Sequence, residues 1–215
     1  MRLDHLSYAA GPEGLASCVQ RLGAQLGAGF TDGGLHPRFG TRNFILALRN
    51  GVYLEVVEAL DHPAVDKAPF GRTVRARTEE GGGWLSWVVG VSDLEAVESR
   101  LGRNAAPGHR VRPDGYDLRW RQIGINDTEN DRQLPWFIHW DSDKQHHPAS
   151  GGGTVNLERL DIAGDRSYVT GFLGEEATAS LETLKVKWLP VEENDGESGI
   201  VRAHFTTAHG VAVID

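Results

Sequence analysis

Glu55 is the first candidate functional residue of this sequence, because it is an acidic residue in the middle of an apolar, strand-like run. Two apolar runs, 43–48 and 52–58, flank Asn50-Gly51, and Asn-Gly between such runs predicts a tight β-hairpin. Side chains alternate along a strand, so Glu55 shares a face with Tyr53 in the middle of the second run. An ionised carboxylate there is costly unless a cation, a metal ion or several hydrogen-bond donors accompany it.

The elements that would position Glu55 belong to a unit that recurs along the chain. A strand-like run, a turn and a helical pattern that stops at Leu-Gly occur at 3–23, 84–102 and 157–174. Two or three further strand-like runs follow each time. This self-similarity indicates internal duplication. We therefore expect modules at 3–59 and 84–141, which share a domain over residues 1–150, and a third, more divergent βαβββ-like module at 151–215.

Six short segments resemble a known family. They are 3–6 (LDHL), 36–43 (HPRFGTRN), 53–55 (YLE), 112–115 (RPDG), 118–121 (LRWR) and 134–138 (LPWFI). Over about the first two-thirds of the chain, they resemble the glyoxalase-like branch of the vicinal oxygen chelate superfamily. The resemblance implies an α+β fold in which tandem βαβββ modules form a cup-shaped, mainly antiparallel mixed sheet with helices outside. It also implies metal ligands on the first and last strands of each module, pointing into the cup.

On that implication, His5, Glu55 and His139 form a metal site with two nitrogens and one carboxylate, suited to zinc, nickel, manganese or iron(II). Glu55 and His139 are also the expected catalytic residues, since a group at the metal would move the substrate proton. Alternatives stay open, because His5 can be a core histidine and His139 can cap a sheet edge. The pattern is also incomplete, since aligning the Leu-Gly stops places Trp84, no usual ligand, opposite His5. Adjacent His146-His147 side chains point apart and are not counted as ligands.

Five further residues are candidates for substrate binding. They are His36, Asn43, Trp84, Arg119 and Trp120. His36 and Asn43 lie at the mouth of the presumed cup, although His36 can be merely exposed and Asn43 can merely pin the loop. Either Arg119 or Trp120 must face inward on its strand, the Arg as a clamp for a carboxylate. Five of the six Trp residues fall between residues 84 and 140, which favours an apolar or aromatic ligand.

Composition argues against several other classes of function. The chain has 215 residues and a net charge of -8, so it offers no basic surface for nucleic acid. No apolar run approaches the roughly 20 residues needed to cross a bilayer, and no signal sequence is visible. We therefore expect a cytoplasmic protein without a membrane partner. The single Cys18 lies on the apolar side of a predicted helix, which indicates a buried thiol.

These observations lead to two functional hypotheses of different classes. The first is a glyoxalase-like, metal-dependent enzyme that acts on a small apolar or aromatic carbonyl or hydroxyl compound, by lyase, isomerase or dioxygenase-like chemistry, with the metal as a Lewis acid. The alternative is a metal-free protein of the same fold that binds a small molecule for sequestration or resistance. Trp84 in a ligand position favours the second, and His5 with Glu55 favours the first. A homodimer also stays open, because large mixed sheets in this superfamily pair between chains.

Overall fold

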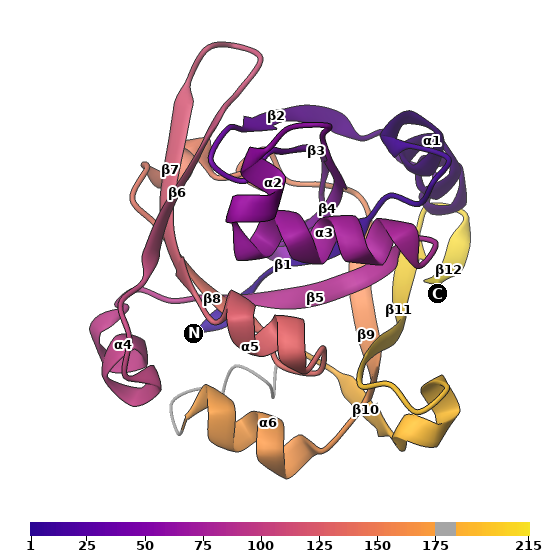
Figure 1. Ribbon diagram of the computed structural model, residues 1–215. Coiled ribbons are helices and arrows are strands. Elements are labelled where there is room, and N and C mark those ends of the chain that lie inside the picture. The colour runs from indigo at the N-terminus through magenta and orange to yellow at the C-terminus, as the bar shows by residue number, and fades with distance from the viewer. Residues whose placement is uncertain (175–183) are drawn as a thin grey trace.

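The computed structural model describes residues 1–174 and 184–215, and Figure 1 shows a barrel beside a smaller sheet. Eight strands close the barrel in the order β1-β4-β3-β2-β6-β7-β8-β5. They are β1 (Arg2–Ala9), β2 (Thr31–His36), β3 (Thr41–Ala47), β4 (Tyr53–Ala59), β5 (Gly83–Gly90), β6 (Ala106–Val111), β7 (Asp117–Ile123) and β8 (Trp136–Trp140). Within the barrel, β1–β4 and β5–β8 pair in parallel and the other neighbouring strands pair antiparallel, so the barrel sheet is mixed and mainly antiparallel. The predicted fold class is confirmed.

The predicted hairpin is the β3–β4 pair. Its turn contains Asn50 with φ 62°, a left-handed conformation that Asn tolerates better than most residues. Ile45 lies opposite Glu55, and Asn43 lies opposite Val57. Residues two apart along a strand share a face, so the side chains of Asn43 and Glu55 are diagonal neighbours on the same side of the sheet.

Helix α1 (Leu15–Leu26) covers the outside of the barrel with a stripe of buried side chains that includes Cys18. The predicted stop at Gly23 is one turn too early. Leu26 extends the buried stripe, and the left-handed residue that ends the helix is Gly27, at φ 61°. In the second module, α4 (Glu95–Leu101) ends at Gly102 as predicted, also with a left-handed glycine.

The C-terminal part of the chain forms a four-stranded sheet in the order β10-β9-β11-β12. Its elements are β9 (Asn156–Ala163), α6 (Arg166–Leu173), β10 (Val186–Leu189), β11 (Gly199–Thr207) and β12 (Gly210–Ile214). Residues 175–183 of the expected third module lie outside the described residues. The domain boundary near residue 150 stays a prediction.

Two apolar cores result from this arrangement. The outer core joins the barrel exterior to the C-terminal sheet and includes Trp87, Phe137 and Phe205. The inner core lies within the barrel and includes Phe70 and Trp136. Between the modules, α2 (Ala64–Lys67) leads into α3 (Pro69–Glu79), which lies across the barrel in Figure 1 and contacts β1, β4 and β5. Phe70 enters the inner core from α3, so this helix covers one side of the barrel interior.

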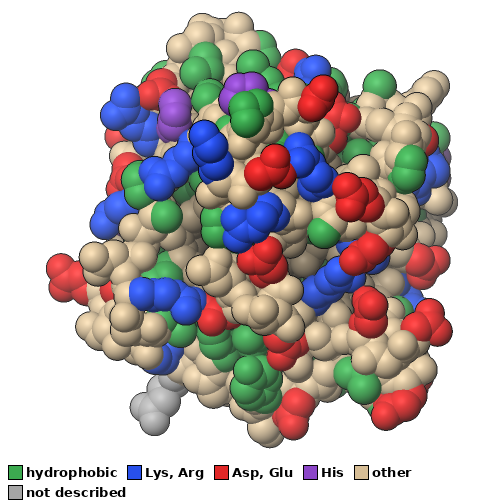
Figure 2. Space-filling model, viewed as in Figure 1, with side chains coloured by type: hydrophobic (Ala, Val, Ile, Leu, Met, Phe, Trp, Pro, Cys, Tyr) green, Lys and Arg blue, Asp and Glu red, His purple; other side chains and the backbone are tan. Residues whose placement is uncertain are grey.

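The surface is acidic overall but carries both signs of charge. The net charge is -8, and Figure 2 shows basic and acidic side chains interspersed over the viewed face. That mixture gives this face no continuous basic patch of the kind that binds phosphate backbones. In the two described segments of the chain, no helix is both long and apolar enough to cross a membrane.

Candidate functional site

A small chamber lies inside the barrel, with a volume of about 30 Å³, enough for one or two water molecules. Most of its wall is aromatic or aliphatic: Phe39, Tyr53, Phe70, Trp120, Trp136, Ile138 and Trp140. The polar residues that line it are His5, His36, Asn43, Glu55, Arg110 and Gln122. An apolar wall with a few convergent polar groups is typical of a small-molecule site.

The chamber adjoins a larger pocket of about 340 Å³ at the barrel surface, beside α5 (Ile125–Asn130). Phe39, Phe70 and Gln122 line both spaces and so form the wall between them. Arg38 and Lys67 are exposed cations on the lining of the outer pocket. A ligand larger than water therefore reaches the polar groups of the chamber only if the Phe39 and Phe70 rings move toward this pocket.

Glu55 is buried in the chamber as an ionised carboxylate. Ser7 Oγ donates to Oε2 at 2.8 Å, and Asn43 Nδ2 donates to Oε1 at 2.6 Å. Burial alone would raise the pKa of Glu55, but the nearby His5 and His36 and these two donors outweigh it and lower the pKa below its usual value. Burial of an ionised Glu55 therefore rests on two hydrogen-bond donors, Ser7 and Asn43.

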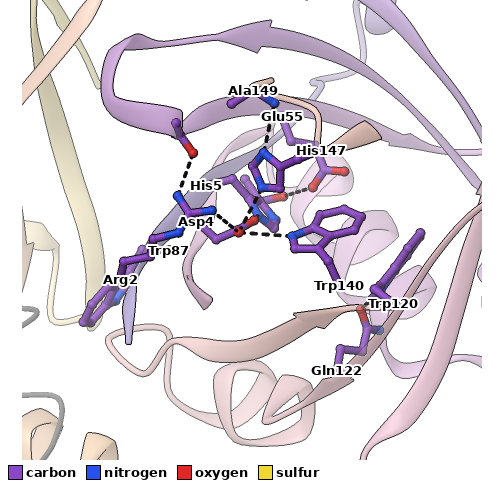
Figure 3. Close-up of polar contacts among 12 residues, drawn as sticks. Arg2, Asp4, His5, Glu55, Trp87, Trp120, Gln122, Trp140, His147 and Ala149 are labelled. Atoms are coloured by element: carbon purple, nitrogen blue, oxygen red, sulfur yellow. Dashed lines mark hydrogen bonds and ion pairs between the residues drawn. The ribbon is translucent and has the colours of Figure 1, made fainter. Parts of the chain in front are cut away.

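His5 is backed by Asp4, the preceding residue on β1. Neighbouring side chains on a strand usually point apart, but the pairing register of β1 with β5 shifts between Leu3 and His5. This bulge lets Asp4 Oδ1 lie 2.8 Å from His5 Nδ1. Figure 3 shows the two side chains together. A carboxylate only accepts hydrogen bonds, so Nδ1 carries the proton, and in neutral His5 the lone pair is on Nε2.

Two further donors hold Asp4 in place. Trp140 Nε1 donates to Oδ2 at 3.1 Å, and His147 Nε2 lies 3.1 Å from the same oxygen (Figure 3). The backbone N–H of Ala149 donates to His147 Nδ1, so in neutral His147 the proton is on Nε2 and points to Asp4. Burial would raise the pKa of Asp4, yet the hydrogen bonds from His147 and His5 lower it well below its usual range. Asp4 is therefore a fixed negative charge behind His5.

His36 is the second imidazole of the chamber and is uncharged at neutral pH. Burial lowers its pKa from 6.5 to about 4, although the negative charge of Glu55 opposes the shift. Nδ1 lies 2.9 Å from Thr41 Oγ1, and the ring packs edge-to-face against Trp120. His36 thus contributes a neutral polar group next to the aromatic wall.

Strand β7 settles which of two neighbouring candidates faces inward. Trp120 lines the chamber, and its Nε1 donates to Gln122 Oε1 at 2.7 Å. Arg119 points outward, with 69% of its side chain exposed, and pairs with Asp117. The inward arginine is Arg110 on the adjacent strand β6, which is buried and donates from Nη1 to Asn43 Oδ1 at 2.8 Å.

Two candidates lie outside the chamber. On β8, Trp136, Ile138 and Trp140 face inward, so His139 lies on the other face, where Nδ1 donates to the Val91 carbonyl at 3.1 Å. Trp84 belongs to the outer core, and its Nε1 donates to the Ile214 carbonyl. The cause is a second register shift, which leaves Leu85 as the extra residue of β5 and turns Trp84 away from the interior.

The chamber does not complete the metal site that the resemblance implies. His5 and Glu55 face it together, but the described residues contain no group of three or more His, Cys, Asp or Glu side chains that could hold a metal ion. The remaining ligands should come from β5 and β8. The inward side chains that these strands place in the inner core and the chamber are apolar: Leu85, Val88, Trp136, Ile138 and Trp140. Ser86 on β5 lies opposite the inward Ser7, but its hydroxyl donates to the Trp87 carbonyl, and a serine is not a usual ligand for these ions. The residues present therefore do not fit the predicted ion.

Arg110, Asp4 and His147 are among the polar residues of the site that the sequence reasoning missed. Arg110 sits in the run Gly108-His109-Arg110, where alternation from a buried Gly108 would have placed it inward. Asp4 could not be found by alternation, because the bulge reverses its direction. His147 comes from a loop, and nothing in the pattern of the sequence connects that loop to β1.

Comparisons with known proteins add a family and a fold. Residues 3–178 match a family model described as a glyoxalase-like domain. A search of curated proteins finds no match. A solved structure of a hypothetical protein from Staphylococcus aureus is similar, with a TM-score of 0.59 and 16% identity, over 80% of this chain and 74% of that chain. Methylmalonyl-CoA epimerase from Mycobacterium tuberculosis is also similar, with a TM-score of 0.44 and 15% identity, over 67% of this chain and 89% of that chain.

Proposed function

The chain belongs to the glyoxalase-like domain family, and from its site we propose that it is an enzyme that moves a proton on a small, partly aromatic carbonyl or hydroxyl compound in the barrel chamber. One observation carries this proposal. His5, with Asp4 bound to Nδ1, lines an aromatic chamber beside the carboxylate of Glu55. Few structural roles require a buried imidazole that faces a small chamber beside one buried carboxylate and is backed by a second buried carboxylate.

His5 acts as the general base in this proposal. Its Nε2 lone pair takes a proton from the carbon or hydroxyl of the ligand, and the imidazolium then returns the proton to the resulting enolate or alkoxide, which gives the product. Asp4 fixes the tautomer and stabilises the imidazolium, as a carboxylate behind a catalytic histidine does in other enzymes. Glu55 adds a second negative charge. Its two hydrogen-bond donors keep it ionised, so its role is electrostatic and it is a weak proton acceptor.

The aromatic wall selects the ligand. The rings of Phe39, Phe70 and Trp120 are candidates to pack on an apolar or aromatic group, while His36 and Asn43 offer polar contacts to its oxygen atoms. A metal-dependent form of the activity has less support, because an ion at His5 and Glu55 would need further ligands that β5 and β8 do not offer.

The test follows hydrogen exchange in a panel of aryl alkyl ketones and arylpyruvates, which carry hydrogens on the carbon next to the carbonyl. In D₂O, wild-type protein should speed the exchange of hydrogens next to the carbonyl, observed by proton NMR. Replacing His5 by Gln should slow this exchange by about 100-fold or more, which is the usual contribution of a general base. Asp4→Asn should slow it less and change its pH profile. Exchange at an unchanged rate in His5→Gln would contradict the role of His5.

A metal-free binding protein is the second candidate, and the apolar inward faces of β5 and β8 favour it. In that case a panel compound should bind wild type without exchange or turnover. His5→Gln should then bind it with similar affinity, since a binding protein needs the wall of the chamber more than a base.

A further inference from the structure

Arg110 is a buried charge at the chamber that has no ion-pair partner among the described residues. It projects from β6, is 4% exposed, and lines the chamber. Its one hydrogen bond within the described residues runs from Nη1 to Asn43 Oδ1, and Nε is buried with no acceptor. A guanidinium has five N–H donors and stays protonated in proteins. Most of its capacity to donate is therefore unused by the protein.

Other arginines with an unsatisfied buried N–H differ from Arg110, because each lies beside a carboxylate. The pairs are Arg42–Asp32, Arg77–Glu80, Arg103–Asp127 and Arg202–Asp161. Within the described parts of the chain, no ion pair joins Arg110 to Asp or Glu. The negative charges of Glu55 and Asp32 act on Arg110 without contacting it directly, and a buried charge without a direct ion-pair partner is costly. An anion in contact with this guanidinium would relieve that cost.

The protein makes room for this guanidinium and orients it. The side-chain carbonyl of Asn43 accepts a hydrogen bond from Arg110, while its NH2 group donates one to Glu55. Flipping this amide group would break both hydrogen bonds, so its orientation is fixed. On β2, a side chain at Gly33 would collide with Nη1 of Arg110 and with Asn43. The glycine thus keeps open the space that the guanidinium fills. One edge of Arg110 is fixed by Asn43, and the other donors remain for a ligand.

We propose that Arg110 binds the carboxylate of the ligand, and that the chamber therefore takes an aromatic carboxylic acid, such as an arylpyruvate-type keto acid or an aryl α-hydroxy acid. A carboxylate matches a guanidinium with two parallel hydrogen bonds. Arg38 and Lys67 on the outer pocket attract the same charge during entry. The choice of a keto or hydroxy acid rests on the proposed proton transfer, whereas the binding of a carboxylate does not.

The experiment titrates benzoate and benzamide, which have nearly the same shape but differ in charge, and follows Trp fluorescence. Wild type should bind benzoate at least tenfold more tightly than benzamide, since a charge-assisted hydrogen bond is worth about 1.5 kcal/mol or more. Arg110→Met should lose this preference, and Arg110→Lys should keep part of it. The matched control is Arg119→Met, which removes an exposed arginine from the neighbouring strand and should bind benzoate like wild type.

A second measurement needs no variant and covers the case in which Arg110→Met fails to fold. In wild type, the Nε–H resonance of Arg110 should shift on adding benzoate and exchange more slowly with water. His5→Gln should still bind benzoate, so loss of proton transfer and loss of carboxylate binding can be told apart. Equal affinity for benzoate and benzamide, binding of neither compound, or full benzoate binding by a folded Arg110→Met would each overturn the proposal.

Discussion

His36 provides a direct test of how the chamber is built. The ring is buried, Nδ1 meets the hydroxyl of Thr41, and burial lowers the pKa from 6.5 to about 4. Replacing His36 by Asn keeps a polar atom near the position of Nδ1 but removes the titrating group. We expect this change to alter how the free energy of unfolding depends on pH.

The sign follows from proton linkage. The unfolded chain binds a proton on His36 near pH 6.5, and the folded protein does so only near pH 4. The contribution of uncharged His36 to the free energy of unfolding is therefore fully present above pH 6.5 and is lost as the pH falls toward 4. A pKa difference of one corresponds to about 1.4 kcal/mol, so the whole difference corresponds to roughly 3 kcal/mol. About 2 kcal/mol of this is lost by pH 5.

Urea unfolding curves at several values between pH 7.5 and pH 5 measure the effect. Wild type should lose about 2 kcal/mol more than His36→Asn over this range. The variants share every other titrating group, so the contributions of those groups cancel in the comparison. His209→Asn is the matched control, because it removes an exposed imidazole from the turn between β11 and β12. If wild type and His36→Asn lose stability in parallel, His36 is not held uncharged in the chamber.

Three other predictions follow from burial and strand geometry. Phe70→Ala should lower the free energy of unfolding in urea by about 3 to 5 kcal/mol, because it removes a buried ring packed against three others; a loss under about 1 kcal/mol would contradict the closed chamber. Cys18 should not react with a thiol reagent at pH 8 until urea unfolds the protein, since burial raises its pKa to about 11, and rapid labelling of native protein would count against this. Zinc added to the protein should dialyse away, because His5 and Glu55 lack further ligands. One tightly held zinc per chain that His139→Ala removes would disprove the geometry described for β8.

Alternation along strands predicted a large part of the site. The Asn-Gly turn fixed the register of the β3–β4 hairpin, and that register places Asn43 and Glu55 on one face. On β1, the inward direction of His5 was expected from the family resemblance, since alternation alone does not say which face is inward. On β7, alternation required either Arg119 or Trp120 to face inward without deciding between them, and it is Trp120 that does so, with Arg119 in solvent.

The structure differs from the sequence-based prediction at residues whose side-chain direction or neighbours are not determined by the alternating pattern of a strand. Bulges in β1 and β5 reverse the direction of Asp4 and Trp84, and a bulge leaves no reliable mark in a single sequence. His139 was chosen for its place near the end of a strand, without asking which face Trp136 and Trp140 occupy. The contact of His147 with Asp4 joins residues 143 positions apart, which no periodic pattern encodes.

The contact between the chain's two ends has a kinetic consequence. Tyr8 on β1 donates to the backbone carbonyl of Asp215, 207 residues later, and Trp84 on β5 donates to the carbonyl of Ile214. Contacts between residues so distant in sequence form late and slow folding, because a long loop must close before they contribute. During synthesis, the outer face of β1 and β5 therefore stays exposed until β12 has left the ribosome. A nascent chain arrested before residue 210 should present Trp84 to chaperones and to other nascent chains, so the yield of folded protein should depend on how quickly the β12 segment is synthesised.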